Sequence, residues 1–179
     1  PSTVDGYTVT SVGASAFMSN ETIKELEISS TISVIDSNAF SDCTALIKLQ
    51  IPGNVETIGK AAFSGCTSLS DVTILDGVKS IDNYAFARCT QLKNLVLPNS
   101  IDSIGDYAFF GCSMLSDIQI PRALKNFGGY VLEGTQWMQN QQQDCVIVGD
   151  GILIKYSGSA SSKALPKQVK IIGNYAFAG

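Results

Sequence analysis

Residues 104–112 read Ile104-Gly105-Asp106-Tyr107-Ala108-Phe109-Phe110-Gly111-Cys112, and the pattern of this stretch returns every 23 residues along the chain. Four rows of residues share the step: Val12, Ile35, Ile58, Ile81 and Ile104; Phe17, Phe40, Phe63, Phe86 and Phe109; Cys43, Cys66, Cys89 and Cys112; and Leu46, Leu69, Leu92 and Leu115. A constant period of this length is typical of a solenoid, in which each repeat is one coil that buries its apolar side against its neighbours. The sequence therefore predicts a column of stacked coils with these rows inside it.

Each coil is expected to contain one strand. Leu95 and Leu97 alternate with Asn94 and Val96, the period-two pattern of a strand with one buried face. Pro98 has no amide hydrogen to donate and is expected to close this strand. The same position holds a proline in other coils: Pro52, Pro121 and Pro166.

The rest of the coil is expected to return along the far side. Ile101 and Ile104 would face inward there, in an extended segment or a tight helical turn. Gly105 is expected to adopt a positive φ angle. Asp36 and Asp82 stand at the same position in other coils, and Asp is one of the few other residues that tolerate this conformation.

Residues 106–112 are expected to form a single helical turn. This turn would place Phe109 in the core, and the small side chain of Ala108 would let adjacent coils approach. The phenylalanine row would then form an offset aromatic stack, each pair of which contributes about 0.5–1.5 kcal/mol beyond burial.

Composition narrows the possible partners. Apolar residues make up 45% of the 179 residues and charged residues 16%, which suits stacked coils with apolar interiors. The net charge is −4 and no cluster of Lys and Arg is present, so nucleic-acid binding is not expected. Apolar runs fall far short of the roughly 20 residues that span a bilayer, so membrane insertion is not expected either.

The cysteines are interpreted as small apolar residues of the core. Four of them would lie in neighbouring coils about 4.8 Å apart, with side chains pointing the same way rather than toward one another, which disfavours disulfides. A ladder of this kind supplies close pairs and not the three or four ligands of a metal site. No cofactor or metal is predicted.

The repeat breaks after Leu132. A polar segment with the only tryptophan, Trp137, is followed by the apolar runs 145–148 and 152–156, which flank Gly149-Asp150-Gly151. This arrangement is a strong β-hairpin signal, and the Gly-Asp-Gly stretch is too short for a calcium loop. Leu132 and Phe177 are 45 residues apart, one short of two periods, so the hairpin is expected to replace one coil without breaking the stack.

The repeat resembles the BspA-like class of leucine-rich repeats, which occurs in surface and secreted proteins of bacteria. The resemblance rests on Leu-x-x-Leu-x-Ile-Pro-x-x-Val-x-x-Ile-Gly-x-x-Ala-Phe-x-x-Cys, from about Val9 to Pro121 and again over 169–178. It implies a right-handed superhelix of α/β type, with a parallel sheet on the concave side and short turns or helical turns on the convex side. It also implies an extracellular or cell-surface location and a role in adhesion. The general leucine-rich pattern has an asparagine ladder after the strand, whereas this chain has Asn54, Gly77, Ser100 and Ala123 there.

Two outward rows on the strands form the candidate ligand surface. The first row is Glu25, Lys48, Asp71, Asn94 and Asp117, and the second is Glu27, Gln50, Thr73, Val96 and Gln119. Alternating charge along Glu25, Lys48 and Asp71 would make adjacent coils attract one another weakly, by about 0.2–1 kcal/mol per pair. These rows are interpreted either as a ladder that keeps the sheet soluble or as a polar, mildly acidic platform for a protein or glycan.

The hairpin region offers the other candidates. Trp137 is expected to pack over the exposed flank of the last regular coil, with an exposed ligand anchor as the alternative. Tyr156 is the second aromatic candidate there.

Catalysis is not expected. The chain has no histidine, which removes His-based triads and His-containing metal sites. Glu25 and Asp71 would lie roughly 10 Å apart on strands two coils apart. Lys48 between them would keep both carboxylates ionised rather than raise the pKa of one.

The chain is thus interpreted as one solenoid over 1–179, with regular coils over about 9–132, a hairpin-modified coil over 133–162 and a final partial coil over 163–179. It begins and ends within a coil, so it is expected to be a fragment of a longer chain. The predicted function is a non-catalytic extracellular interaction or adhesion module that binds a host protein or glycan. The alternative is a structural spacer or self-associating stalk.

Overall fold

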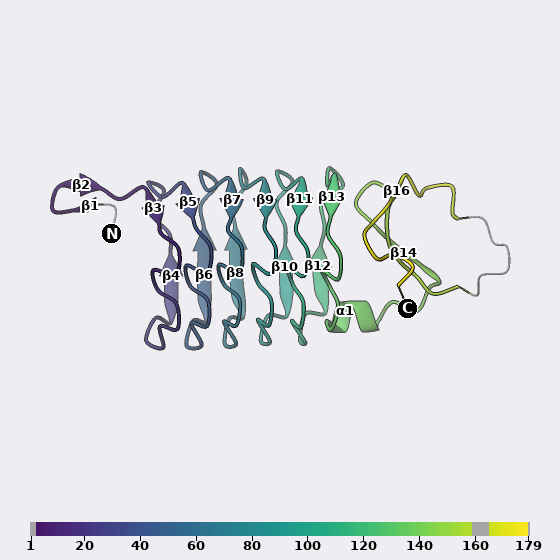
Figure 1. The fold of residues 1–179 in the computed structure, drawn as a ribbon, viewed down its shortest axis with the longest axis horizontal. Helices are drawn as coiled ribbons and strands as arrows, with labels where there is room; N and C mark the ends of the chain where they lie inside the picture. Colours follow the sequence, from purple (N-terminus) through teal and green to yellow (C-terminus); the bar gives the residue numbers. More distant parts are fainter. Residues whose placement is uncertain (1–2, 159–164, 179) are drawn as a thin grey trace.

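The computed structural model describes residues 3–158 and 165–178 of the chain. Across these residues the backbone winds into coils that lie side by side in a nearly straight row (Figure 1). Equivalent residues of neighbouring coils pair directly: Ser80 lies opposite Ser103, and Ile81 lies opposite Ile104. The predicted solenoid with its 23-residue period is therefore confirmed.

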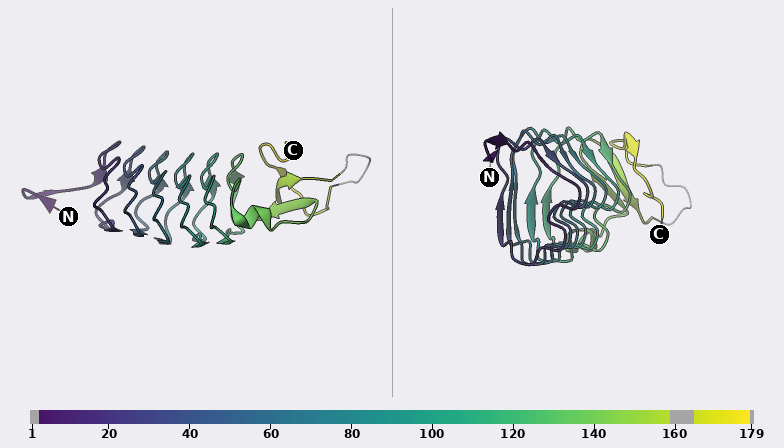
Figure 2. Two further views of the ribbon diagram at one scale, coloured as in Figure 1. Left: turned by 90° about the horizontal axis from the view of Figure 1, so that it is seen from below. Right: turned by 60° about the vertical axis from the view of Figure 1, so that its left-hand side comes forward.

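Two rows of parallel strands run along the column (Figure 2). The first row is one six-stranded sheet of two-residue strands: β3 (Ser11–Val12), β5 (Val34–Ile35), β7 (Thr57–Ile58), β9 (Ser80–Ile81), β11 (Ser103–Ile104) and β13 (Asn126–Phe127). The second row holds β4 (Glu25–Glu27), β6 (Lys48–Ile51), β8 (Asp71–Ile74), β10 (Asn94–Val96) and β12 (Asp117–Gln119). The segment that contains Ile104 is thus extended, one of the two conformations expected for it.

The second row is not continuous. Strands β4, β6 and β8 form one sheet, and β10 and β12 form another. The break lies beside the coil whose corner reads Leu75-Asp76-Gly77, where the proline of other coils is missing. At this corner the backbone of Gly77 packs against Gly53 of the preceding coil so closely that a Cβ on Gly53 would lie 2.9 Å from the Asp76 carbonyl carbon.

The core is a column in which the predicted rows stack. Successive phenylalanine rings, from Phe17 to Phe109, lie 5.1 to 5.7 Å apart between centroids and are nearly parallel. Phe40, Phe63, Phe86 and Phe109 are buried, as are the cysteine and leucine rows. The offset aromatic stack is confirmed, and it draws its burial from contacts between coils rather than within them.

The segment around Phe109 is not the predicted helical turn. It is a succession of turns in which Tyr107 and Gly111 have φ angles of 58° and 70°. The Phe110 amide donates to the Tyr107 carbonyl 3.1 Å away within the coil, whereas the Phe109 amide donates to the Val131 carbonyl 3.0 Å away in the next coil. A single helical turn would leave its first four amides without an internal partner, whereas these turns direct alternate amides to carbonyls of the next coil.

The prediction of a positive φ at Gly105, Asp36 and Asp82 is wrong. The left-handed residues lie two positions later, as at Asn38 (φ 55°) and Tyr84 (φ 60°).

Glycine at this position instead allows close packing between coils. A Cβ on Gly59 would lie 2.5 Å from the Ile35 carbonyl oxygen and 2.8 Å from the Asp36 carbonyl carbon. Because these are backbone atoms, the clash could not be relieved by a side-chain rotation.

Side chains after the second strand row link coils. The Asn54 side-chain amide donates to the Ile32 carbonyl, and the Ser100 hydroxyl donates to the Val78 carbonyl 2.7 Å away. Gly77 has no side chain, but its amide donates to the Ser100 hydroxyl at 2.8 Å. Asn54 and Ser100 therefore make the kind of coil-to-coil bond expected of an asparagine ladder.

The predicted hairpin is confirmed. Strands β14 (Cys145–Val148) and β15 (Ile152–Tyr156) pair antiparallel, and Gly149 and Gly151 between them have φ angles of 56° and 100°. Strand β15 then pairs parallel with β16 (Ile171–Ile172), so a further coil continues beyond the hairpin. These strands form a sheet of their own that does not join β13.

Short elements flank these units. Helix α1 (Gln136–Gln139) is N-capped by Thr135, whose hydroxyl accepts a hydrogen bond from the Met138 amide at 3.1 Å. A small antiparallel pair, β1 (Thr3–Val4) and β2 (Tyr7–Thr8), precedes the first coil.

Most of the Ser/Gly stretch over 157–162, and the expected start of the final coil at 163, lie outside the described residues. Within the part of the chain that is described, no helix is long and apolar enough to cross a membrane.

Candidate interaction surfaces

The ten strand residues predicted to face outward form one surface, here called the strand face. It consists of Glu25, Glu27, Lys48, Gln50, Asp71, Thr73, Asn94, Val96, Asp117 and Gln119. All are exposed except Gln50, which is half-buried. Lys48 pairs in register with Glu25 on one side and Asp71 on the other. Among the described residues none of these three forms an ion pair, whereas Lys125 and Asp102 do at 3.0 Å. The predicted rows exist, but they are divided where the sheet breaks.

The strand face offers polar contacts and one apolar point. Val96, the last residue of β10, is 59% exposed. The surface beside it forms a shallow depression whose lining includes Pro98, Pro121 and Arg122. The face carries no aromatic side chain, so it lacks the residue types that dominate tight protein interfaces.

Trp137 packs against the column rather than standing free. Its side chain is half-buried against the core, and its amide donates to the Leu115 carbonyl 2.7 Å away. This confirms the expected packing of the tryptophan over the last regular coils.

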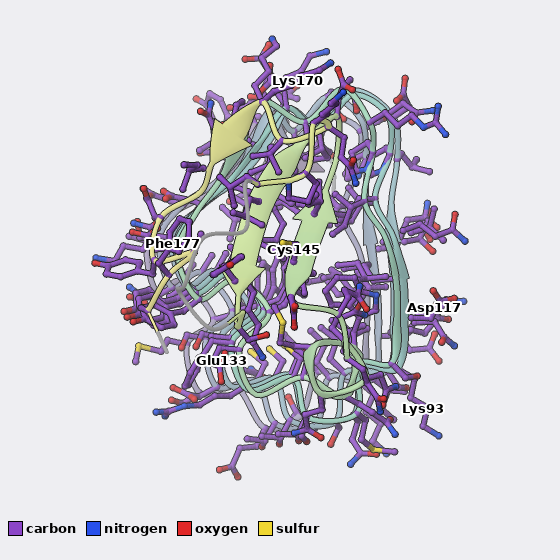
Figure 3. All side chains as sticks on the ribbon, turned by 90° about the vertical axis from the view of Figure 1, so that its right-hand side faces the viewer. Lys93, Asp117, Glu133, Cys145, Lys170 and Phe177 are labelled. Atoms are coloured by element: carbon purple, nitrogen blue, oxygen red, sulfur yellow. The ribbon has the colours of Figure 1, made fainter. Side chains whose placement is uncertain are left out.

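Tyr156 does not join the strand face. Its ring lies 5.2 Å from that of Phe177, tilted by 46°. In a view along the column, Phe177 and Asp117 of the strand face lie on opposite sides of the molecule (Figure 3).

The structure also shows a surface that the sequence analysis missed. Tyr84, Tyr107, Tyr130 and Tyr175 stack in a row, here called the tyrosine row, with ring centroids 4.8, 5.3 and 4.7 Å apart. Phe110 packs edge-on against Tyr107 at 5.7 Å. The first three tyrosines are 23 residues apart, so the period itself could have revealed them. Tyr175 comes from the coil after the hairpin and still stacks on Tyr130.

Backbone geometry holds the tyrosine row. All four tyrosines have positive φ angles, between 55° and 60°. Gly129 leaves room for the last ring, because a Cβ at this position would lie 2.7 Å from the Tyr175 Cε2 atom. Burial and the neighbouring phenols of Tyr84, Tyr130 and Tyr175 raise the pKa of Tyr107, as expected for hydroxyls gathered in one row.

The buried cysteines are more than apolar filler. Each thiol of the row donates to the carbonyl of a phenylalanine 26 residues earlier, as from Cys66 to Phe40 at 3.2 Å and from Cys112 to Phe86 at 3.1 Å. Burial raises the pKa of Cys66 to about 12 and also raises that of Cys89. All five cysteines are free, and the described residues contain no cluster of three or more potential metal ligands.

Thiol reactivity should follow burial. In the folded protein a disulfide reagent is expected to modify Cys145, which is only half-buried, well before the four thiols of the row, which are buried and inaccessible to it. Spectroscopic titration of the released thiolate would show one early equivalent and the others only after unfolding. A Cys145→Ser variant that still releases an early equivalent would contradict the assignment.

Comparison with known proteins agrees with this architecture. A family model described as the BspA type leucine rich repeat region matches residues 8–140 in six copies. No curated protein matches the chain.

Solved structures resemble it. A leucine-rich cell surface protein from Faecalibacterium prausnitzii is 31% identical with a TM-score of 0.64, covering 72% of this chain and 35% of that protein. A leucine-rich repeat protein from Eubacterium ventriosum is 25% identical with a TM-score of 0.55, covering 72% and 41%. The pneumococcal vaccine antigen PcpA shares the fold, with 19% identity, a TM-score of 0.51 and coverage of 95% and 48%. The chain thus spans less than half of each of these proteins.

Proposed function

Because the chain belongs to the BspA-type leucine-rich repeat family, we propose that it is a non-catalytic interaction module that acts at a cell surface or outside the cell. Repeat proteins of this kind offer long, rigid surfaces on which many small contacts can add up. The module would bind a host protein or glycan through its exposed side chains, and adhesion would follow from that binding.

The observation that carries the proposal is the regular outward display of side chains over a rigid column. Parallel pairing holds Glu25, Lys48 and Asp71 in register, and the buried phenylalanine stack beneath supports them. A ligand therefore meets a preorganised surface, which lowers the entropic cost of binding.

A non-catalytic role agrees with the chemistry on display. Glu25 and Asp71 are both exposed and flank Lys48 on neighbouring strands. Both carboxylates lie on an open, solvated face and lack the enclosed setting in which catalytic acids and bases are usually held.

The surface location is supported by the relatives. The Faecalibacterium protein is described as a cell surface protein, and PcpA is described as a vaccine antigen. We extend that location to this chain as part of the proposal.

A structural spacer is the second candidate. The strand face is polar and has no aromatic anchor, as expected of a surface whose main task is to stay soluble. A self-associating stalk predicts particles that lengthen with concentration in solution scattering, and a concentration-independent monomer would exclude that form of the spacer.

The first candidate predicts saturable binding to at least one member of a panel of matrix proteins and glycans, measured by biolayer interferometry. The double variant Lys48→Glu/Val96→Arg on the strand face is expected to weaken binding at least tenfold if this face is the contact. The matched control is Lys79→Glu/Val34→Arg, which changes two exposed residues of the same types elsewhere on the column. If no member of the panel binds saturably, the proposal that the chain is an interaction module is wrong.

A further inference from the structure

The tyrosine row presents ring edges and hydroxyls to solvent. The rings of Tyr84, Tyr107 and Tyr130 stack face to face, so the faces between these three rings are already occupied. The ring of Tyr175 is tilted by 33° against that of Tyr130. Tyr84 is 39% exposed and Tyr175 is 59% exposed, while Tyr107 and Tyr130 are half-buried. A partner would therefore meet a line of hydroxyl groups and polarised C–H edges rather than open aromatic faces.

The hydroxyls are available. None of the four forms a hydrogen bond with another group within residues 3–158 and 165–178. Each can donate one hydrogen bond and accept others. Since the rings repeat at 4.7 to 5.3 Å, these groups form a regularly spaced series along the column.

Folding alone does not account for the row. The same position holds Ser15, Asn38 and Ala61 in the first coils, which stack without an aromatic ring there. From Tyr84 onward the position is tyrosine in every regular coil, and Tyr175 resumes the row after the hairpin. Exposed aromatics that continue across a break in the repeat are more readily explained by a ligand than by packing.

We propose that the tyrosine row binds an extended, uncharged glycan chain. This inference rests on the proposed function, because it names the ligand class and the surface of that module. The row is a straight, periodic series of neutral donors and acceptors, and a polysaccharide presents neutral hydroxyls with a comparable repeat.

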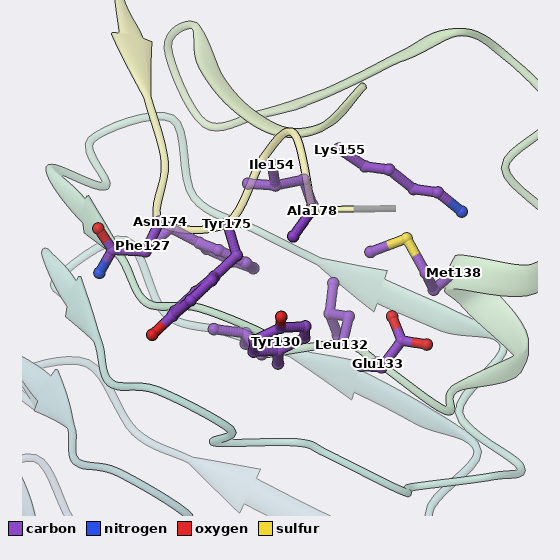
Figure 4. A pocket seen from close by; sticks show the side chains of 11 residues that line it. Phe127, Tyr130, Leu132, Glu133, Met138, Ile154, Lys155, Asn174, Tyr175 and Ala178 are labelled. Atoms are coloured by element: carbon purple, nitrogen blue, oxygen red, sulfur yellow. The ribbon is translucent and has the colours of Figure 1, made fainter. Parts of the chain in front are cut away.

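A small cleft at one end of the row adds a second contact. It has a volume of about 60 Å³, and its lining includes Tyr130, Tyr175, Glu133, Lys155 and Asn174 (Figure 4). One carboxylate and one ammonium group leave the cleft without net charge. This balance suits a neutral substituent of a sugar ring and disfavours a polyanion.

Phenylalanine substitutions separate hydroxyl binding from packing. The variant Tyr84→Phe/Tyr107→Phe/Tyr130→Phe/Tyr175→Phe keeps the stacked rings and removes the four hydroxyls. Binding would be measured by isothermal titration with soluble glucans, mannans and xylans, with heparin as the charged probe. We expect one neutral glycan to bind, the variant to lose at least tenfold in affinity, and Lys48→Glu/Val96→Arg to bind as the unaltered chain does.

The outcomes distinguish this inference from the proposed function. Binding of a protein ligand that Lys48→Glu/Val96→Arg abolishes, with no neutral glycan bound, would overturn the inference and leave the interaction module standing. A protein ligand lost in the phenylalanine variant would make a protein the occupant of the row, and heparin as the preferred ligand would contradict the uncharged class. If the fourfold variant does not fold, the double variant Tyr84→Phe/Tyr175→Phe is tested instead, because it alters only the two most exposed rings. It too is expected to lose at least tenfold in affinity for the neutral glycan, and an unchanged affinity would overturn the inference.

Discussion

Replacement of Phe63 by alanine is expected to lower the free energy of unfolding by about 3–5 kcal/mol, the range for large-to-small substitutions of a buried aromatic residue. The Phe63 ring is fully buried between the rings of Phe40, 5.3 Å away, and Phe86, 5.4 Å away. Its removal therefore creates a cavity and interrupts the aromatic stack in the middle of the column. Urea denaturation followed by circular dichroism would measure the change.

The same experiment can reveal more than a loss of stability. In a repeat column each coil contacts only its neighbours, so a weakened centre can uncouple the two ends. A broadened or two-step transition in Phe63→Ala would show this uncoupling. The control is Lys48→Ala on the strand face, expected to change stability by less than about 1 kcal/mol. Similar losses in the two variants would refute the inward and outward assignments.

Gly59→Ala is expected to lower the free energy of unfolding by about 1–3 kcal/mol through overpacking. The added methyl group would lie 2.5 Å from the Ile35 carbonyl oxygen, and the neighbouring atoms are backbone of the preceding coil. The two coils must separate to admit it, which also strains the hydrogen bond from the Gly59 amide to the same Ile35 carbonyl. Thermal unfolding by calorimetry would measure the loss.

The matched control is Gly13→Ala, at the equivalent position of the first coil. A Cβ there has no atom within 4 Å, and the φ angle of Gly13 is not positive. Alanine restricts the unfolded chain more than glycine does, so this variant should be neutral or stabilised by up to about 1 kcal/mol. If Gly13→Ala proves as harmful as Gly59→Ala, the cost arises from local conformation and not from contact between coils.

The fold could be predicted because the period alone specifies which residues are neighbours. Phe63 stacks between Phe40 and Phe86 as a direct consequence of equal steps along the chain. The hairpin was also predictable, because two apolar runs around Gly149 and Gly151 leave few alternatives.

The backbone conformation of the turn segments could not be predicted from the 23-residue period. The stretch around Ala108 and Phe109 was interpreted as a helical turn, but hydrogen bonding between coils decides the conformation there. The role of Gly105 was misjudged for a similar reason: glycine indicates either a positive φ or a close approach, and only the position of the neighbouring coil tells which.

The candidate surface was predicted in part. The strand face followed from alternation along each strand, but this alternation gives no sign of the break between β8 and β10. The tyrosine row was overlooked because its residues lie in turns, where a period-two pattern gives no information about exposure. Tyr175 falls out of the exact period, so only the structure shows that it completes the row.

The contact of Tyr175 with Tyr130 has a consequence for how the sequence of this protein can change in evolution. Tyr130 and Tyr175 are 45 positions apart in the sequence, yet their rings are in contact, as in neighbouring regular coils. The hairpin between these two rings is not free of the column, because Val148 and Ile152 are part of its buried core. A different insertion could replace the hairpin in evolution or by design if it kept both end points and these apolar contacts, and the coils on either side would then keep their places.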